Sequence, residues 1–243
     1  MRCLVALFAV ALGACASTTP TEDGPRVLVY TNANGYVHAS IPVGVEALRE
    51  IGAERGFDVD ATDDSSAFTD DRLAGYAAVV FLSTTGDVLG RGGEAALRAF
   101  VEGGGGFVGV HAAADTEYDW SWYRTLVGAY FDNHPPTQRA TVVVAEAEHA
   151  ATRGLPARWE RTDEWYAFDA RPSGVRVLLR LDESTYEGGT MGGDHPIAWA
   201  HAVGQGRSVY TAMGHTAESY AEPLFRGHLA GAVCWAARAA CAE

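Results

Sequence analysis

The N-terminal half of the chain alternates apolar strand-like segments with helical ones, and this alternation restricts the fold more than any other feature. Strands are expected at residues 26–31, 57–61, 77–83 and 107–110. Helices are expected between them at residues 41–55 and 93–102. Apolar strands separated by helices are typical of a parallel sheet with helices on both faces. We therefore predict an α/β fold that is doubly wound, flavodoxin-like and mostly parallel.

The C-terminal half is less regular but still alternates apolar and polar segments. Further strands are expected at residues 139–145, 175–181, 197–201 and 208–211. Helices are expected at residues 120–130 and 224–239. Because no repeat or linker divides the chain, residues 25–243 are expected to form a single domain, long enough to bury a large core.

The first 14 residues are typical of a bacterial lipoprotein signal peptide. An apolar run at residues 4–12 follows Arg2 and is too short to span a bilayer as a helix. The sequence Leu12-Gly13-Ala14-Cys15 resembles a lipobox, which predicts cleavage before Cys15 and lipidation of that residue. The alternative is an ordinary secretory signal that is cut near Ala14 or Ala16.

The residues after the predicted cleavage site indicate where such a protein would reside. Ala16, rather than an aspartate, favours the outer membrane, and polar residues 15–24 would form a short tether. The sequence thus predicts an exported lipoprotein of the cell envelope that faces the periplasm and meets the membrane only through its lipid.

Cysteine and basic-residue content exclude several classes of site. Cys234 and Cys241 are seven residues apart in a predicted helix, about 10 Å along its axis, so they could pair only if the helix ends between them. All 18 basic residues are arginines, which excludes a Schiff-base lysine and the lysine of a P-loop nucleotide site. A net charge of −13 argues against nucleic-acid binding.

Three histidines follow separate predicted strands at the point where each strand ends. They are His38, His111 and His215. In an open parallel sheet, ligands bind beyond the carboxyl ends of the strands. We therefore expect the three imidazoles to converge in one cavity, whereas a separation well over about 10 Å would exclude shared metal binding or proton transfer.

The segment around His111 has the outline of a nucleophile elbow. Gly109 and Ala113 are the small residues two positions before and after it, as a sharp strand-to-helix turn requires. Histidine is a poor acyl-transfer nucleophile, but it can bind a metal or carry a proton. The turn would direct this imidazole into the cavity.

These segments together resemble the ThuA-like (trehalose utilisation) family. The resemblance rests on residues 27–31, 35–42, 80–87, 104–112 (GGGFVGVHA), 115–120 (DTEYDW), 162–166, 194–199 and 214–216. It implies the fold of class I glutamine amidotransferases, with His111 in place of their cysteine and His215 in place of their histidine. It also implies a link to trehalose-related disaccharides, including keto-sugars. The histidine at the elbow argues against glutaminase activity.

Aromatic and acidic residues near these strand ends fit a sugar ligand. Aromatic rings stack on sugar C–H surfaces, and carboxylates accept hydrogen bonds from hydroxyl groups. The candidates for substrate binding are Asp87, Asp115, Trp120, Trp165 and Tyr166. His134 and His195 precede prolines and lie on loops from which either could reach the cavity.

The same region supplies candidate metal ligands and catalytic groups. His38, His111 and His215, with Glu164 as a fourth ligand, would suit zinc or a similar divalent ion. His111, His215 and Glu164 are also the candidate catalytic residues. The leading hypothesis is an envelope enzyme acting on a carbohydrate, with a non-catalytic sugar-binding protein or an interaction module as alternatives.

Overall fold

The computed structural model describes residues 24–239 and 241, which form one α/β domain around a mixed nine-stranded sheet. Its strands are β1 (Arg26–Tyr30), β2 (Asp58–Thr62), β3 (Ala78–Leu82), β4 (Gly106–Val110), β6 (Gln138–Val144), β7 (Arg158–Asp163), β9 (Arg176–Asp182), β10 (Pro196–Val203) and β11 (Gly206–Thr211). They lie in the order β2-β1-β3-β4-β11-β10-β9-β6-β7. Two short strands, β5 (Phe131–Asn133) and β8 (Ala167–Phe168), pair separately.

The sheet is parallel on one side of β11 and antiparallel on the other. Strands β2, β1, β3, β4 and β11 run in one direction. Beyond β11, each neighbouring pair from β10 to β7 is antiparallel. The expectation of a mostly parallel sheet is therefore correct only for the N-terminal half and β11. In the C-terminal half, short connections such as the one between β10 and β11 force antiparallel pairing.

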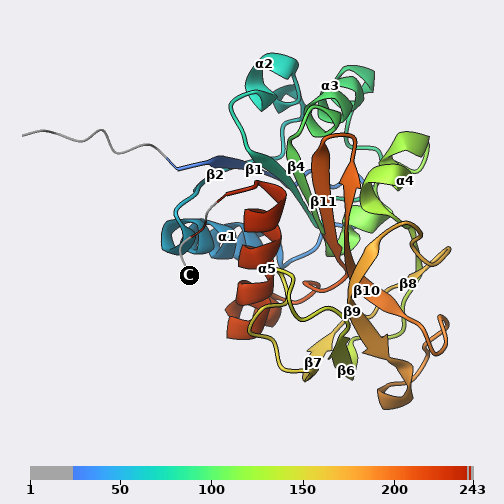
Figure 1. Ribbon diagram of the computed structural model, residues 1–243. Coiled ribbons are helices and arrows are strands. Elements are labelled where there is room, and N and C mark those ends of the chain that lie inside the picture. The colour runs from blue at the N-terminus through green and yellow to red at the C-terminus, as the bar shows by residue number, and fades with distance from the viewer. Residues whose placement is uncertain (1–23, 240, 242–243) are drawn as a thin grey trace, which may run out of the picture.

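Helices cover both faces of the parallel part (Figure 1). They are α1 (Ile41–Arg55), α2 (Asp70–Leu73), α3 (Arg91–Glu102), α4 (Ser121–Val127) and α5 (Pro223–Ala236). Helices α1 and α5 pack against each other, and α5 also packs against β3, β4 and β11. Helices α3 and α4 contact β11 from the other side.

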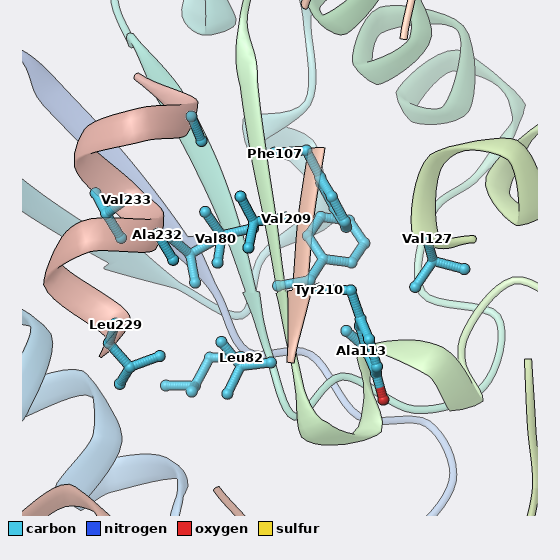
Figure 2. Packing of buried hydrophobic residues seen from close by; sticks show 14 of the residues in the cluster. Val80, Leu82, Phe107, Ala113, Val127, Val209, Tyr210, Leu229, Ala232 and Val233 are labelled. Atoms are coloured by element: carbon cyan, nitrogen blue, oxygen red, sulfur yellow. The ribbon is translucent and has the colours of Figure 1, made fainter. Parts of the chain in front are cut away.

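The core fills the spaces on both sides of the central strands. Figure 2 shows Leu229 and Val233 of α5 facing Val80 and Val209, while Tyr210 points to the opposite side of the sheet. All five of these side chains are fully buried. The continuous apolar strands recognised in the sequence thus pack against helices on both faces, which makes the central sheet a rigid base for the loops at its edge.

Two features of the C-terminal half depart from expectation. Strand β7 was not predicted, because its sequence RWERTD is polar and its residues alternate between exposed and buried. Helix α5 ends at Ala236, earlier than predicted, and this allows Cys234 and Cys241 to form a disulfide with their Cα atoms 5.9 Å apart.

The signal peptide, Cys15 and the tether expected within residues 1–24 lie almost wholly outside the described residues, of which only Gly24 belongs to that segment. Within the described part of the chain, no helix has the length and apolar character needed to cross a membrane.

Candidate metal and catalytic site

Three histidines and one glutamate meet at the carboxyl edge of the parallel strands. His38 lies in the loop between β1 and α1, His111 directly after β4, and His215 after β11. Their ring centroids are 4.8 Å (His38–His111), 5.2 Å (His38–His215) and 5.2 Å (His111–His215) apart. The expected convergence of the three imidazoles is therefore confirmed. Glu164, the residue after β7, completes the group, which we call the His/Glu cluster.

The turn at His111 is as sharp as its sequence predicts. His111 has a φ of 52°, a left-handed conformation that is rare for a non-glycine residue, and its side chain is fully buried. A Cβ on Gly109 would lie 3.1 Å from the Tyr210 ring and 3.2 Å from the Ala113 methyl group. A side chain at Gly109 would thus crowd its neighbours, and the turn is followed by a 3₁₀ helix at His111–Asp115.

A backbone carbonyl fixes which nitrogen of His111 faces the cluster. Its Nδ1 lies 2.8 Å from the carbonyl oxygen of Ala212, and because that oxygen only accepts, Nδ1 must carry the hydrogen. In the neutral ring, Nε2 then has a free lone pair directed at the cluster. A backbone carbonyl that accepts from the other ring nitrogen commonly orients a metal-binding histidine in this way.

Glu164 connects the other members of the cluster. Its Oε2 lies 3.1 Å from His215 Nδ1 and 3.4 Å from His111 Nε2. Burial alone would raise the pKa of Glu164, but hydrogen bonds and charges of both histidines hold it below its usual range. The hydrogen bond to Glu164 raises the pKa of His215.

His38 is buried, and one of its two ring nitrogens has no polar partner among the described residues. Its Nδ1 makes no hydrogen bond within the part of the chain that the structure describes. Burial, followed by the nearby His111 and His215, lowers the pKa of His38 to about 3. The ring is therefore neutral near pH 7 and keeps an unprotonated nitrogen for a ligand.

Three members of the cluster, His38, Glu164 and His215, line a cavity of about 370 Å³, whereas His111 is fully buried and does not line it. The residues that line the cavity are Tyr36, His38, Asp115, Phe131, His134, Glu164, Tyr166 and His215. His134 lies at its exposed side, with Nδ1 3.1 Å from Glu164 Oε1 and 39% of its side chain accessible. Of the two loop histidines considered from the sequence, His134 reaches the site. His195 is buried behind it and bonds to the carbonyl of Tyr166 at 2.8 Å.

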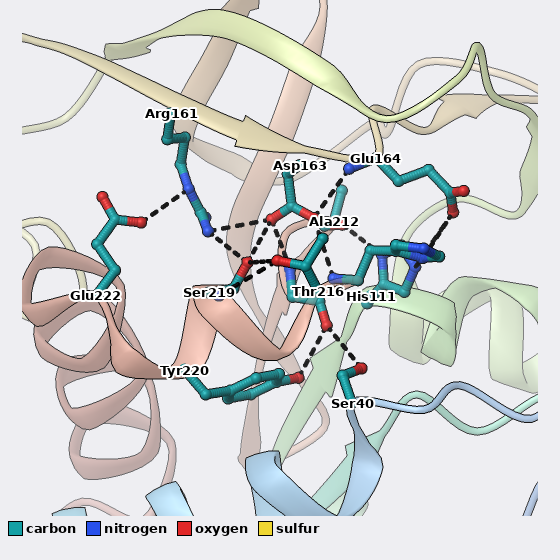
Figure 3. Close-up of polar contacts among 12 residues, drawn as sticks. Ser40, His111, Arg161, Asp163, Glu164, Ala212, Thr216, Ser219, Tyr220 and Glu222 are labelled. Carbon is teal, nitrogen blue, oxygen red and sulfur yellow. Dashed lines mark hydrogen bonds and ion pairs between the residues drawn. The ribbon is translucent and has the colours of Figure 1, made fainter.

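A buried carboxylate that sequence analysis did not single out holds two of the site loops together. Asp163 accepts hydrogen bonds from the backbone N–H groups of Glu164 (2.9 Å), Gly214 (2.9 Å) and His215 (3.0 Å). Figure 3 shows it between these loops and the guanidinium of Arg161, which lies 3.2 Å away. No sequence signal indicated this role, because β7 was not predicted and the strand end that Asp163 occupies was therefore not recognised.

The candidate sugar-binding residues divide into two groups. Asp115 and Tyr166 line the cavity, and burial raises the pKa of Asp115. Trp120 packs against Trp122, with ring centroids 4.9 Å apart, and does not line the cavity.

Trp165 and Asp87 also lie away from this cavity. Trp165 is fully buried and its indole N–H donates to the backbone oxygen of Gln138, so it is a core residue with no surface for a ligand. Asp87 is exposed and lies beside Glu94 and Glu117.

The donor atoms of the His/Glu cluster fit a small divalent cation. Three pairs, among His111 Nε2, His215 Nδ1 and Glu164 Oε2, are 3.1–3.4 Å apart. Tetrahedral zinc with bonds near 2.1 Å requires donors separated by about 3.4 Å. One donor atom from each of the four residues lies within 4.8 Å of the others. A mixed imidazole and carboxylate set is the kind that catalytic zinc sites use.

Comparisons with known proteins agree with this architecture. The family model for trehalose utilisation, ThuA, matches residues 26–236. A ThuA-like protein from Bacteroides uniformis is similar in structure, with a TM-score of 0.74 and 26% identity over 90% of this chain and 94% of that one. A ThuA-like protein from Parabacteroides merdae has a TM-score of 0.74 and 21% identity, over 88% and 90% of the two chains.

More distant likenesses concern the fold alone. A β-galactosidase from Bacillus circulans sp. alkalophilus is similar over 88% of this chain but only 31% of its own, with a TM-score of 0.59 and 14% identity. A search of curated protein sequences finds no match.

Proposed function

Because the chain belongs to the ThuA family, we propose that it is a metal-assisted enzyme of trehalose-related carbohydrate metabolism whose His/Glu cluster holds a divalent ion such as zinc. The observation that carries this proposal is the donor spacing of 3.1–3.4 Å among His111, His215 and Glu164. Family membership supports the substrate class, and the proposal extends it to keto-disaccharides, since a bound metal would polarise a sugar carbonyl or activate a water molecule.

The residues around the cluster support the handling of a polar substrate. Asp115 lines the cavity, and burial raises its pKa. It is therefore suited to exchange a proton with the substrate or to accept a hydrogen bond from a sugar hydroxyl group. His134 lies between solvent and Glu164, where it can pass a proton to or from the cavity. Tyr166 packs 4.3 Å from His111 between ring centroids and gives the cavity an aromatic wall.

Metal content provides the direct test. Protein purified and reconstituted with divalent ions is expected to hold about one ion per chain by elemental analysis. Glu164→Gln should weaken binding by about 100-fold or more, because it removes the anionic ligand. Glu160→Gln, on the exposed side of β7, is the matched control and should retain the metal. Stoichiometric metal in Glu164→Gln, or none in the wild type, would contradict the proposal.

A saccharide screen separates enzyme from binding protein. Metal-loaded protein is tested against trehalose and oxidised disaccharides, with thermal shift reporting binding and product analysis reporting turnover. Turnover that is lost in His111→Ala supports the enzyme. Binding without turnover, unchanged in His111→Ala, supports the sugar-binding alternative.

No acyl-transfer chemistry is expected. His111 occupies the elbow position, and Cys234 and Cys241, the cysteines within the described residues, are joined to each other. We also propose that the protein acts as a lipid-anchored component of the cell envelope, as the sequence around Cys15 predicts.

A further inference from the structure

A second cavity, of about 730 Å³, lies at the other end of the sheet from the His/Glu cluster. It is lined by Arg55 at the end of α1, by Trp235 and Arg238 at the end of α5, by Arg207 at the start of β11, and by Arg153 of the loop before β7. These positions are at the amino ends of the parallel strands, whereas the histidines follow the carboxyl ends. We call it the arginine cavity.

The charge of the arginine cavity is opposite to that of the protein. Four arginines line it, and none of the described residues lining it is acidic, although the chain has a net charge of −13. The carboxyl ends of α1 and α5 contribute roughly half a negative charge each. Arg153, Arg207 and Arg238 alone outweigh these two partial charges, so the described lining of the cavity is positively charged.

Two of the arginines are held in place by backbone carbonyl groups, and one of them, Arg238, donates to the Gln205 carbonyl oxygen at 2.5 Å. The Arg207 guanidinium lies 4.8 Å from the centroid of the Trp235 ring and donates to the Trp235 carbonyl oxygen at 2.9 Å. Burial, and after it the charge of Arg238, lowers the pKa of Arg207, so the two positive charges repel each other. An anion between them would relieve that repulsion.

Arg238 occupies a backbone position that normally selects glycine. Its φ is 54°, and the bonds from Arg238 N–H to Trp235 and from Ala239 N–H to Cys234 form the motif that closes a helix with a left-handed residue. A non-glycine residue in this left-handed conformation is strained. The structure thus places an arginine at the cavity where local backbone geometry disfavours it.

We propose that the arginine cavity binds the phosphate group of an anionic ligand. Guanidinium groups match phosphate oxygens with paired hydrogen bonds, and several of them suit a phosphate better than a single carboxylate. The volume of about 730 Å³ accommodates a ligand larger than the phosphate alone. The shared chemistry is a phosphate ester, either a lipid head group or a small phosphorylated compound.

Gly24, the first described residue, lies near the arginine cavity. A side chain at Gly24 would collide with the carbonyl of Gly56, which follows the cavity residue Arg55. Under the proposed anchor at Cys15, the nine residues 16–24 would hold this end of the molecule near a membrane. The proposal that the ligand is a lipid depends on that anchor. The proposal that the cavity binds a phosphate group does not.

The test uses the full chain in a non-ionic detergent. Calorimetry measures binding of inorganic phosphate and of phosphatidylglycerol in mixed micelles, with phosphatidylcholine micelles as the uncharged reference. The variant Arg153→Gln/Arg238→Gly removes two cavity charges while placing glycine at the left-handed position, so its fold is expected to be preserved. The control Arg91→Gln/Arg139→Gln removes two exposed charges elsewhere.

The double cavity variant is expected to lose about tenfold or more in affinity, and the control to match the wild type. Binding of phosphatidylglycerol but not of phosphate identifies a lipid head group, and the reverse identifies a small phosphorylated ligand. No binding of either probe by the wild type, or equal binding by the cavity variant, would overturn the proposal. Metal content at the His/Glu cluster, measured on the same samples, reports separately on the proposed function.

Discussion

Asp163 is the single residue on which most of the site geometry depends. It does not line the cavity, but its carboxylate accepts hydrogen bonds from the backbone N–H groups of Glu164, Gly214 and His215. A buried carboxylate that accepts several hydrogen bonds can orient the metal-binding residues beside it without contacting the metal. Asp163 is therefore a positioning residue for two members of the His/Glu cluster.

Replacing Asp163 with Asn tests this role. The amide would turn an N–H₂ group toward backbone N–H donors, so we expect a loss of about 1–3 kcal/mol in the free energy of unfolding. We also expect metal affinity to fall by about 10–100-fold, measured by competition with a chelator at a temperature where the variant is folded. Asp182→Asn, at the end of β9, changes a similar strand-end carboxylate away from the cluster and should leave affinity unchanged. Wild-type affinity in Asp163→Asn would refute the positioning role.

At the residue level, the histidines of the cluster were predictable from the sequence, but the residues that position them were not. His38, His111 and His215 were predictable because each follows an apolar strand, and strand ends meet at one edge of the sheet. Asp163 and the cavity role of His134 depend on contacts between distant segments, which no local pattern encodes. Trp165 was predicted to bind the substrate, but it lies in the core. Its sequence context does not distinguish an aromatic ring in the core from one that lines a cavity.

At the level of elements, the loop after β3 is tied to the loop after β4 by Glu117. Its buried carboxylate accepts the N–H groups of Val88 at 2.9 Å and Leu89 at 2.6 Å. Burial raises the pKa of Glu117 from 4.5 to about 7, with Asp87 adding to the increase and the two N–H bonds opposing it. Asp87 thus acts on this carboxylate and does not line the His/Glu cavity.

Glu117 should make the stability of the protein depend on pH. Between about pH 4.5 and 7 the folded state retains a proton that the unfolded chain releases, so stability falls as pH rises through this window. Glu117→Gln removes that titration, and the variant should gain about 1–3 kcal/mol relative to the wild type between pH 4.5 and 7.5. Urea denaturation at several pH values measures the difference. A constant difference across the window would disprove this account.

Regular elements were predictable where burial is complete and not where it is one-sided. Helix α1 was expected at its observed bounds, because a proline in its first turn and Gly56 after its end are strong local signals. The antiparallel strands have weaker signals, and β7 exposes every second residue of a polar sequence. In this half the direction of each strand depends on its connections, whose ends these weak strand signals do not locate.

At the level of the whole molecule, the two cavities lie at opposite ends of the sheet. If the chain is anchored at Cys15, the arginine cavity would face the membrane and the His/Glu cavity would open away from it. This orientation suits an enzyme that meets soluble sugars in the periplasm.

Cys15→Ser tests the anchor. The variant should move from the membrane to the soluble fraction, whereas Cys3→Ser, within the predicted signal peptide, should leave the distribution unchanged. Mass spectrometry of the wild-type N-terminus provides the second measurement. A mature chain that begins at another residue, or Cys15 without lipid, would reject the prediction.

The last of the described strands in chain order, β11, lies in the middle of the sheet. Strand β11 pairs with β4 on one side and with β10 on the other, so neither half can close without it. Until it arrives, the apolar edge of β4 remains unpaired and is open to association with other chains. His215 arrives directly after the same strand, so a chain interrupted earlier has neither a closed sheet nor a complete cluster. Protection by chaperones during synthesis would therefore matter most after residues 106–205 have been made and before β11 has been made.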